Sequence, residues 1–161
     1  MGVKPELARQ IRTASSLHDI GKEKLPPELL NKPGKLDAHE FEIIKTHTKL
    51  GAEMLSSMQG ALGEMARIIA LYHHEHWDGN GYWGVPACSL PDYVGVTAIC
   101  DVFTALLVAR PYKEAFPPEE ALEYIQNQSG AQFSEELVNV FIPLVRNDSR
   151  VYEIFKGAVS F

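Results

Sequence analysis

The sequence predicts an all-α fold, arranged as a single helical bundle of 161 residues with the functional site in its core. Apolar residues recur mainly at helical spacing, and few stretches alternate in the way that a half-buried strand does. Prolines and glycines gather in a few segments between the periodic stretches. An apolar content of 45% with 22% charged residues is ordinary for one globular core.

The overall charge and the cysteine count exclude several classes of protein. A net charge of -6 argues against an extended nucleic-acid surface, so duplex DNA or RNA is not expected as a partner. The cysteines Cys88 and Cys100 are too few for a disulfide framework. No signal peptide and no apolar run of membrane-spanning length is evident, so we expect a cytoplasmic protein without a membrane contact.

The first apolar stripe predicts a helix over residues 7–17 that leads directly to His18 and Asp19. Gly21 is expected to end or bend this helix. Three prolines and a glycine then make residues 25–35 a loop with one short helical turn. This arrangement places a histidine and a carboxylate side by side at a helix terminus.

A second helix is predicted to begin at Asp37, because Glu40 follows three residues later in the pattern of a capping box. Its apolar stripe begins at Phe41 and continues to Met54, which predicts one long helix. His47 lies on the inward face of this helix and is expected to be buried.

Two further helices are predicted, over residues 62–74 and 94–109, on either side of a loop over 77–91. The loop is rich in glycine and proline, and it has a length that is uncommon unless functional, so we expect it to rim the active site. The second of these helices is strongly apolar and carries Asp101 as its only charge. A buried carboxylate needs a partner, and a metal ion would supply one.

The last part of the chain is predicted to hold two more helices, over 119–128 and 134–142. Ser134 is a suitable N-cap for the second of them, and Pro143 is expected to stop it. No internal repeat, low-complexity tract or domain linker is evident in the chain.

Six side chains with metal-ligating chemistry lie at predicted apolar helix faces or helix ends. A lone His-Asp pair is weak evidence, but this number of ligands suits two adjacent divalent ions bridged by a carboxylate. Imidazole and carboxylate favour first-row metals such as manganese, iron or zinc. His39 and His76 have charged neighbours and are expected to be solvated. The six candidates are His18, Asp19, His47, His73, His74 and Asp101.

Six motifs in this chain resemble those of the HD-GYP domain, a branch of the HD phosphohydrolase superfamily, in order and in spacing. The resemblance covers essentially the whole chain. It implies an all-helical domain with a two- or three-metal iron or manganese centre, which hydrolyses cyclic di-GMP to pGpG or GMP. The motifs are HDIGK at 18–22, NKPGKL at 31–36, HTKLGAEML at 47–55, YHHEHWDGNGY at 72–82, AICDVFTAL at 98–106 and RPYKEA at 110–115.

The resemblance also implies a role for each of the matching residues. The six candidates would be metal ligands, with Asp19 as the bridge, and the cofactor would be two divalent ions, iron or manganese in preference to zinc, nickel or magnesium. Lys22 would lie close to the metals and stabilise charge on the phosphate oxygens. Arg110 and Lys113 would contact phosphate, and Tyr82 would contact the ligand or a partner protein. A solvated lysine, a basic turn and a packing aromatic are the alternative interpretations.

The chain departs from the family pattern at several positions. The family's histidine on an earlier helix has no counterpart in the 17 residues before His18, so residues 1–161 are expected to form an HD-GYP-like domain without its usual first helix. Trp83 replaces the proline of the GYP motif, Gly95 replaces an arginine, and Thr104 stands where a second aspartate is common. Each of these changes removes a metal ligand, removes a charged side chain or alters the conformation expected for the loop.

Two classes of function remain open on this sequence. The retained ligands favour a metal-dependent cyclic di-GMP phosphodiesterase. The departures favour a degenerate module that binds cyclic di-GMP, or a signalling protein docked at the 77–91 loop, without turnover. A hydrolase for another nucleotide is a third interpretation, but the DGNGY sequence within the loop favours the narrower branch.

Overall fold

The structure is a computed structural model that describes residues 4–109 and 114–147. Its contacts divide the chain into two compact units, Met1–His74 and Glu75–Phe161. In the described residues, every assigned element is a helix, apart from an isolated β-bridge between Ser129 and Phe133. The all-α prediction is therefore confirmed. In the described part of the chain, no helix is both long enough and apolar enough to span a membrane.

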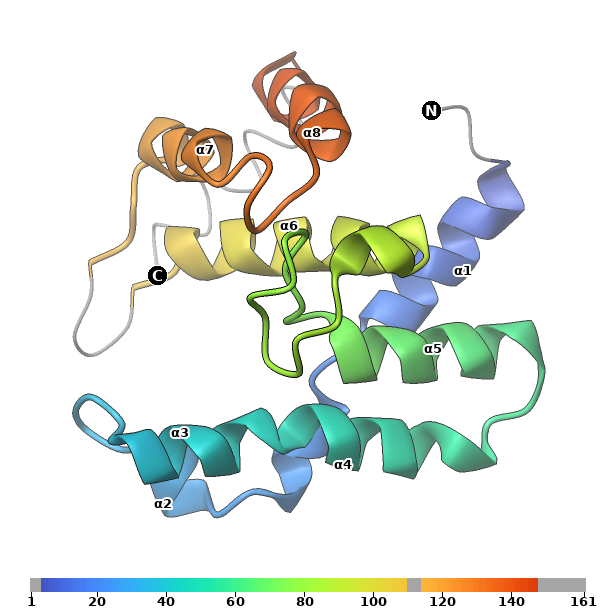
Figure 1. Ribbon diagram of the computed structural model, residues 1–161, viewed down its shortest axis with the longest axis vertical. Coiled ribbons are helices and arrows are strands. Elements are labelled where there is room, and N and C mark those ends of the chain that lie inside the picture. Colours follow the sequence, from blue (N-terminus) through green and yellow to red (C-terminus); the bar gives the residue numbers. More distant parts are fainter. Residues whose placement is uncertain (1–3, 110–113, 148–161) are drawn as a thin grey trace. The chain divides into compact units, whose positions relative to one another are not determined.

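The first unit consists of helices that surround a small apolar core. Four residues are fully buried in it: Ala14 of the first helix of this unit, Pro5–Ser15, and Ala66, Ile69 and Ala70 of its last helix, Gly60–Tyr72. In Figure 1 the last helix runs back alongside the fourth, and contacts between these two helices are extensive. The elements are α1 (Pro5–Ser15), η1 (Ile20–Lys24), α2 (Pro27–Leu30), α3 (Ala38–Lys45), α4 (His47–Met54), η2 (Leu55–Ser57) and α5 (Gly60–Tyr72).

The first predicted helix forms, but it ends earlier than expected, at Ser15. The chain then tightens into turns, in which the amide of His18 donates to the carbonyl oxygen of Ser15 at 3.2 Å. Asp19 becomes the N-cap residue of η1. Leu7 was assigned to the apolar stripe but is 37% exposed, in the first turn of the helix.

The single long helix predicted after Asp37 is broken at Thr46, between α3 and α4. The Thr46 hydroxyl donates to the carbonyl oxygen of Ile43 at 2.6 Å, and the Thr46 amide bonds to the same oxygen at 3.0 Å. Such back-bonding by threonine competes with the regular helical pattern and tightens the turn. The capping box of Asp37 and Glu40 is confirmed. Phe41 was assigned to the buried stripe but is 41% exposed.

Helix α4 passes very close to η1 at a crossing of two glycines. A Cβ atom added to Gly21 would lie 1.9 Å from the carbonyl oxygen of His47 and 2.4 Å from the amide nitrogen of Gly51. Gly51 lies against η1 on one side and against Ala70 of α5 on the other. The missing side chains allow the backbones of η1, α4 and α5 to approach one another.

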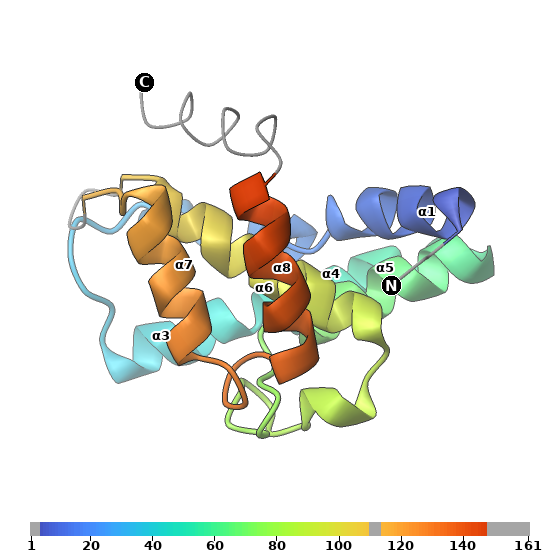
Figure 2. The ribbon, with the colours of Figure 1, turned by 90° about the horizontal axis from the view of Figure 1, so that it is seen from above.

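The second unit has its own hydrophobic core, built mainly by three long helices of the described residues. Phe103 of α6, Leu122 and Ile125 of α7 and Val138 of α8 are almost fully buried in it. Figure 2 shows α7 and α8 side by side, and contacts link α7 to both α6 and α8. The elements are η3 (Ala87–Ser89), α6 (Asp92–Leu107), α7 (Pro118–Asn127) and α8 (Glu135–Asn147).

The prediction that Pro143 stops the last helix is wrong, because α8 continues through it to Asn147. Pro143 is exposed, while its neighbours Ile142 and Val145 are buried in the core. We attribute the continuation to this packing, which outweighs the hydrogen bond that proline removes. The predicted cap is confirmed, since the Leu137 amide donates to the Ser134 hydroxyl oxygen at 3.1 Å.

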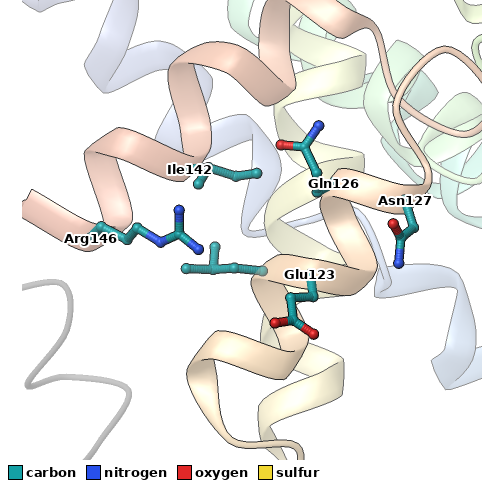
Figure 3. Close-up of a pocket in the computed structure, with 6 residues that line it drawn as sticks. Glu123, Gln126, Asn127, Ile142 and Arg146 are labelled. Atoms are coloured by element: carbon teal, nitrogen blue, oxygen red, sulfur yellow. The ribbon is translucent and has the colours of Figure 1, made fainter.

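A groove lies between α7 and α8 in the second unit (Figure 3). Leu122 and Ile142 form its floor, and polar side chains surround them. Arg146 bonds across it to Glu119, with Nη2 and Oε2 2.9 Å apart. Both side chains are half exposed, so this ion pair contributes little stability.

Candidate metal centre

Four of the predicted ligands meet within the first unit. One oxygen of Asp19 and one ring nitrogen each of His47, His73 and His74 all lie within 4.8 Å of one another. The His73 and His74 ring centroids are 4.1 Å apart, and the His47 ring lies 5.2 Å from that of His74. Residues from three separate segments of the chain therefore converge on one point.

The ends of helices position these ligands. Asp19 is the N-cap residue of η1, His47 is the first residue of α4, and His73 is the C-cap residue of α5. The glycine crossing of η1 and α4 at Gly21 holds the first two of these ends together. Ligands at helix termini can point into a shared space because the backbone there turns away from the helix axis.

Carbonyl oxygens orient three imidazole rings of the site. Nδ1 of His18 lies 2.8 Å from the carbonyl oxygen of Ser15, and Nδ1 of His47 lies 2.7 Å from that of Ile44. Nδ1 of His73 lies 3.1 Å from the carbonyl oxygen of Ile69. A carbonyl oxygen only accepts, so each Nδ1 carries the proton and donates it. In the neutral ring, Nε2 then presents a lone pair, as in a metal-ligating histidine.

The Nε2 lone pairs of His47 and His73 face one another and the Asp19 carboxylate. The Nε2 atoms of His47 and His73 are 3.4 Å apart, and they lie 3.2 and 3.7 Å from Asp19 Oδ1. Asp19 Oδ1 is buried and accepts no hydrogen bond of ordinary geometry. Three electron-rich atoms in such proximity repel one another unless a cation lies among them. The donor set thus fits a divalent metal ion.

The electrostatic environment keeps Asp19 ionised. Burial raises the pKa of this carboxyl group, but polar contacts with His18, His47, His73 and Lys22 outweigh burial and hold the pKa well below its ordinary value. Lys22 Nζ lies 2.5 Å from Asp19 Oδ2. The carboxylate is therefore available as an anionic ligand, with a fixed positive charge beside it.

The remaining predicted site residues have different outcomes. His18 lies outside the group of four, but its Nε2 is 3.3 Å from Asp19 Oδ2. Asp101 is on α6 in the second unit at a partly exposed position, so its role as a ligand stays a prediction. Tyr82 is partly buried in the loop. Arg110 and Lys113 lie outside the described residues.

Other histidines and the departures from the family pattern can also be located. His39 is exposed as predicted, whereas His76 is partly buried. The Thr104 hydroxyl donates to the carbonyl oxygens of Cys100 and Asp101, so it bonds to its own helix. A Cβ atom added to Gly95 would lie 2.9 Å from Leu137 Cδ1, so the small residue allows α8 to pack closely on α6.

The predicted loop over 77–91 is held by several backbone contacts in the second unit. The His76 carbonyl oxygen accepts from the amides of Gly79 and Ala87, at 3.1 and 2.9 Å. The amides of Trp77 and Asp78 donate to the carbonyl oxygens of Gln132 and Ala131, at 3.1 and 3.0 Å. The loop is therefore fastened near both of its ends.

One residue of this loop region was missed in the sequence. Glu75 is only 2% exposed, and its two carboxylate oxygens accept from the amides of Trp83 at 2.7 Å and Val85 at 2.8 Å. A charged residue directly after His74 gave no periodic signal of burial. The one available cue was its place before a glycine-rich loop, whose amides need acceptors.

Comparison with known proteins identifies the family of this chain. The HD domain family matches residues 1–137. A cyclic di-GMP phosphodiesterase of Thermotoga maritima is 40% identical over 153 residues, which cover 94% of this chain and 42% of that protein. The cyclic di-GMP phosphodiesterase response regulator RpfG of Xanthomonas campestris is 41% identical, over 88% of this chain and 38% of that protein.

A third relative is named for a different cyclic dinucleotide. The 3'3'-cGAMP-specific phosphodiesterase 2 of Vibrio cholerae is 39% identical, over 88% of this chain and 27% of that protein. The chain thus spans less than half the length of each of these relatives. The family match includes the cluster in the first unit and ends in the first residues of α8 in the second. The chain belongs to the HD domain family, as the resemblance carried by its six motifs predicted.

Proposed function

We propose that this chain is a metal-dependent phosphodiesterase that hydrolyses cyclic di-GMP to pGpG and GMP in the cytoplasm. The cluster of Asp19, His47, His73 and His74 carries this proposal. Its lone pairs and ionised carboxylate match what a divalent ion requires, and phosphate diesters are a common substrate of such centres. Relatives named as cyclic di-GMP phosphodiesterases support the choice of substrate.

We propose that two divalent ions are bound, iron or manganese in preference to zinc, nickel or magnesium. Asp19 has two oxygens facing different partners, with Oδ1 near His47 and Oδ2 near His18, which suits a bridging carboxylate. His18 and Asp101 are the proposed ligands that complete the set. Bound divalent ions would supply Lewis acidity toward the phosphate and lower the pKa of water.

The protein's own side chains have separate proposed tasks in this reaction. Lys22 lies against Asp19 and presents a fixed positive charge next to the cluster, where negative charge grows on the phosphate oxygens. Arg110 and Lys113 are proposed to bind the phosphates of the substrate. Tyr82 is proposed to contact a nucleobase, because a phenol ring offers a flat apolar face with a polar edge.

The test is an anaerobic turnover assay. Protein loaded with iron(II) or manganese receives cyclic di-GMP, and chromatography follows pGpG and GMP. The same assay with 3'3'-cGAMP in place of cyclic di-GMP tests the substrate named for the third relative. Product from metal-loaded protein, with none from the Asp19→Asn variant, is the expected result. Hydrolysis that is equally fast in this variant would contradict the proposed centre.

A second candidate function is binding of the cyclic dinucleotide, or of a signalling protein at the 77–91 loop, without turnover. Trp83 in place of the proline of the GYP motif favours this alternative. This alternative predicts that fully metal-loaded protein binds cyclic di-GMP saturably. It also predicts that no pGpG or GMP is released. Calorimetry and the turnover assay on one preparation distinguish the two functions.

A further inference from the structure

Glu75 is an acidic side chain that lies inside the second unit and has no place in the proposed metal centre. It is 2% exposed, and each of its two oxygens accepts a backbone amide of the 77–91 loop. The distances are 2.7 Å from Trp83 N to Oε1 and 2.8 Å from Val85 N to Oε2. Hydrogen bonds to an ionised acceptor are about twice as strong as neutral ones.

These two bonds act on a different part of the loop from the other attachments. The loop begins at Trp77 and Asp78, whose amides bond to residues 131 and 132, and the His76 carbonyl oxygen accepts the amide of Ala87 near its far end. Glu75 binds two amides at the loop's centre, those of Trp83 and Val85. The Glu75 carboxylate therefore holds the loop at Trp83 and Val85.

We propose that Glu75 is a positioning residue for the cyclic dinucleotide: by holding the amides of Trp83 and Val85, it keeps the centre of the loop in the binding conformation. This inference rests on the proposed function, because the loop carries the proposed ligand contact Tyr82. Glu75 follows His74 directly in the sequence, so a single short segment carries two metal ligands and the anchor of the loop. In this proposal Glu75 acts through the two loop amides and not by direct contact with metal or ligand.

The anchoring of the loop by Glu75 also depends on which residue occupies position 83. A proline has no amide hydrogen, so the bond from residue 83 to Glu75 exists only because Trp83 replaces the proline of the GYP motif. The departure that suggested a damaged loop thus adds a hydrogen bond to it. The indole side chain and the amide of Trp83 make different predictions, and substitution separates them.

The first test compares Glu75→Gln with the control Glu123→Gln, the same chemical change on the exposed surface of α7. Glutamine keeps one acceptor but turns an NH2 group toward the second amide. Glu75→Gln is expected to speed hydrogen exchange of residues 82–85 and raise KM for cyclic di-GMP about tenfold, by the loss of one charge-assisted bond. Metal content and kcat are expected to stay unchanged, and the control is expected to alter none of these quantities.

The second test compares Trp83→Pro with Trp83→Phe. Proline removes the amide hydrogen of residue 83, which is one of the two that Glu75 holds. Phenylalanine keeps this amide and removes only the indole. Trp83→Pro is expected to raise hydrogen exchange at Val85, whereas Trp83→Phe is expected to leave it unchanged. If both variants behave alike, the amide of residue 83 is not what holds the loop.

The outcomes distinguish this inference from the proposed function. Unchanged loop exchange in Glu75→Gln would overturn the anchor whether or not the protein hydrolyses anything. Faster exchange with unchanged KM, or unchanged dissociation constant if the wild-type protein shows no turnover, would leave an anchor without a role in ligand binding and overturn the proposal. Loss of metal from this variant would also overturn it, because Glu75 would then act on the centre. Absence of turnover in the wild-type protein would contradict only the proposed function.

Discussion

The residue-scale features of the site are the orientation of each histidine ring and the charge of one carboxylate. The carbonyl oxygens of Ser15, Ile44 and Ile69 each lie within hydrogen-bond distance of an Nδ1 atom, so the Nε2 atoms are left as donors to a metal. Each of these carbonyls comes from three or four residues earlier in the chain. The local backbone therefore selects the tautomer of each ring.

Asp19→Ala is expected to abolish tight binding of at least one metal ion, because it removes the carboxylate that approaches His18, His47 and His73. The bound metal per chain, measured by elemental analysis after dialysis, is expected to fall by one or more. Asp37→Ala is the matched control, since Asp37 caps α3 and has no place in the cluster. Unchanged stoichiometry in Asp19→Ala would refute the assignment of this carboxylate as the bridge.

Lys22→Gln is expected to lower kcat by about 10- to 100-fold, with metal content unchanged, because it removes a fixed charge from the growing oxyanion. Lys22 Nζ lies 2.5 Å from Asp19 Oδ2. Lys24→Gln is the control, since Lys24 lies in the same 3-10 helix but is exposed. Steady-state kinetics on both variants measure the difference. Equal kcat values for the two variants would assign Lys22 to the solvated surface.

At the element scale, the site depends on how closely η1, α4 and α5 approach one another. Gly21 and Gly51 lie at the crossing, and each lacks the Cβ atom that would separate two backbones. The sequence suggested only that Gly21 ends or bends a helix. Its contact with the backbone of α4 joins residues about 30 apart in sequence, and no local pattern indicates such a contact.

Gly21→Ala is expected to destabilise the first unit by about 3 kcal/mol or more and to weaken metal binding, because the new Cβ meets backbone atoms that cannot move aside. Chemical denaturation measures the free energy of unfolding, and metal titration measures affinity. Gly95→Ala is the control, since its Cβ meets only the flexible end of Leu137. An equal, small effect in both variants would show that the glycine crossing does not position the ligands.

At the scale of the whole molecule, the proposed ligands of the cluster come from three segments of the first unit, around residues 19, 47 and 73–74. A metal ion that binds all three segments binds the folded unit and not the unfolded chain. Binding therefore adds to stability in proportion to the logarithm of the free metal concentration over Kd. The second unit has its own core of α6, α7 and α8.

Removal of metal by a chelator is expected to lower the unfolding temperature, and a metal concentration 100 times Kd is expected to restore about 2.7 kcal/mol. Calorimetry measures the midpoint, and hydrogen exchange locates the change. The loss of protection is expected in α4, α5 and η1, with α7 and α8 as the internal reference. Identical midpoints with and without metal would indicate that the cluster does not bind an ion across these segments.

The sequence by itself determined the all-α class, most helices and the histidines and aspartate of the cluster, because helical periodicity, capping residues and motif spacing are local properties. The tertiary structure alone decided three features: the glycine crossing of Gly21 and Gly51, the continuation of α8 through Pro143, and the burial of Glu75 under the loop. Each depends on contacts between parts of the chain that a local pattern does not relate. Close backbone approach, packing against a core and acceptance of a loop amide are decided only when those parts meet in the fold.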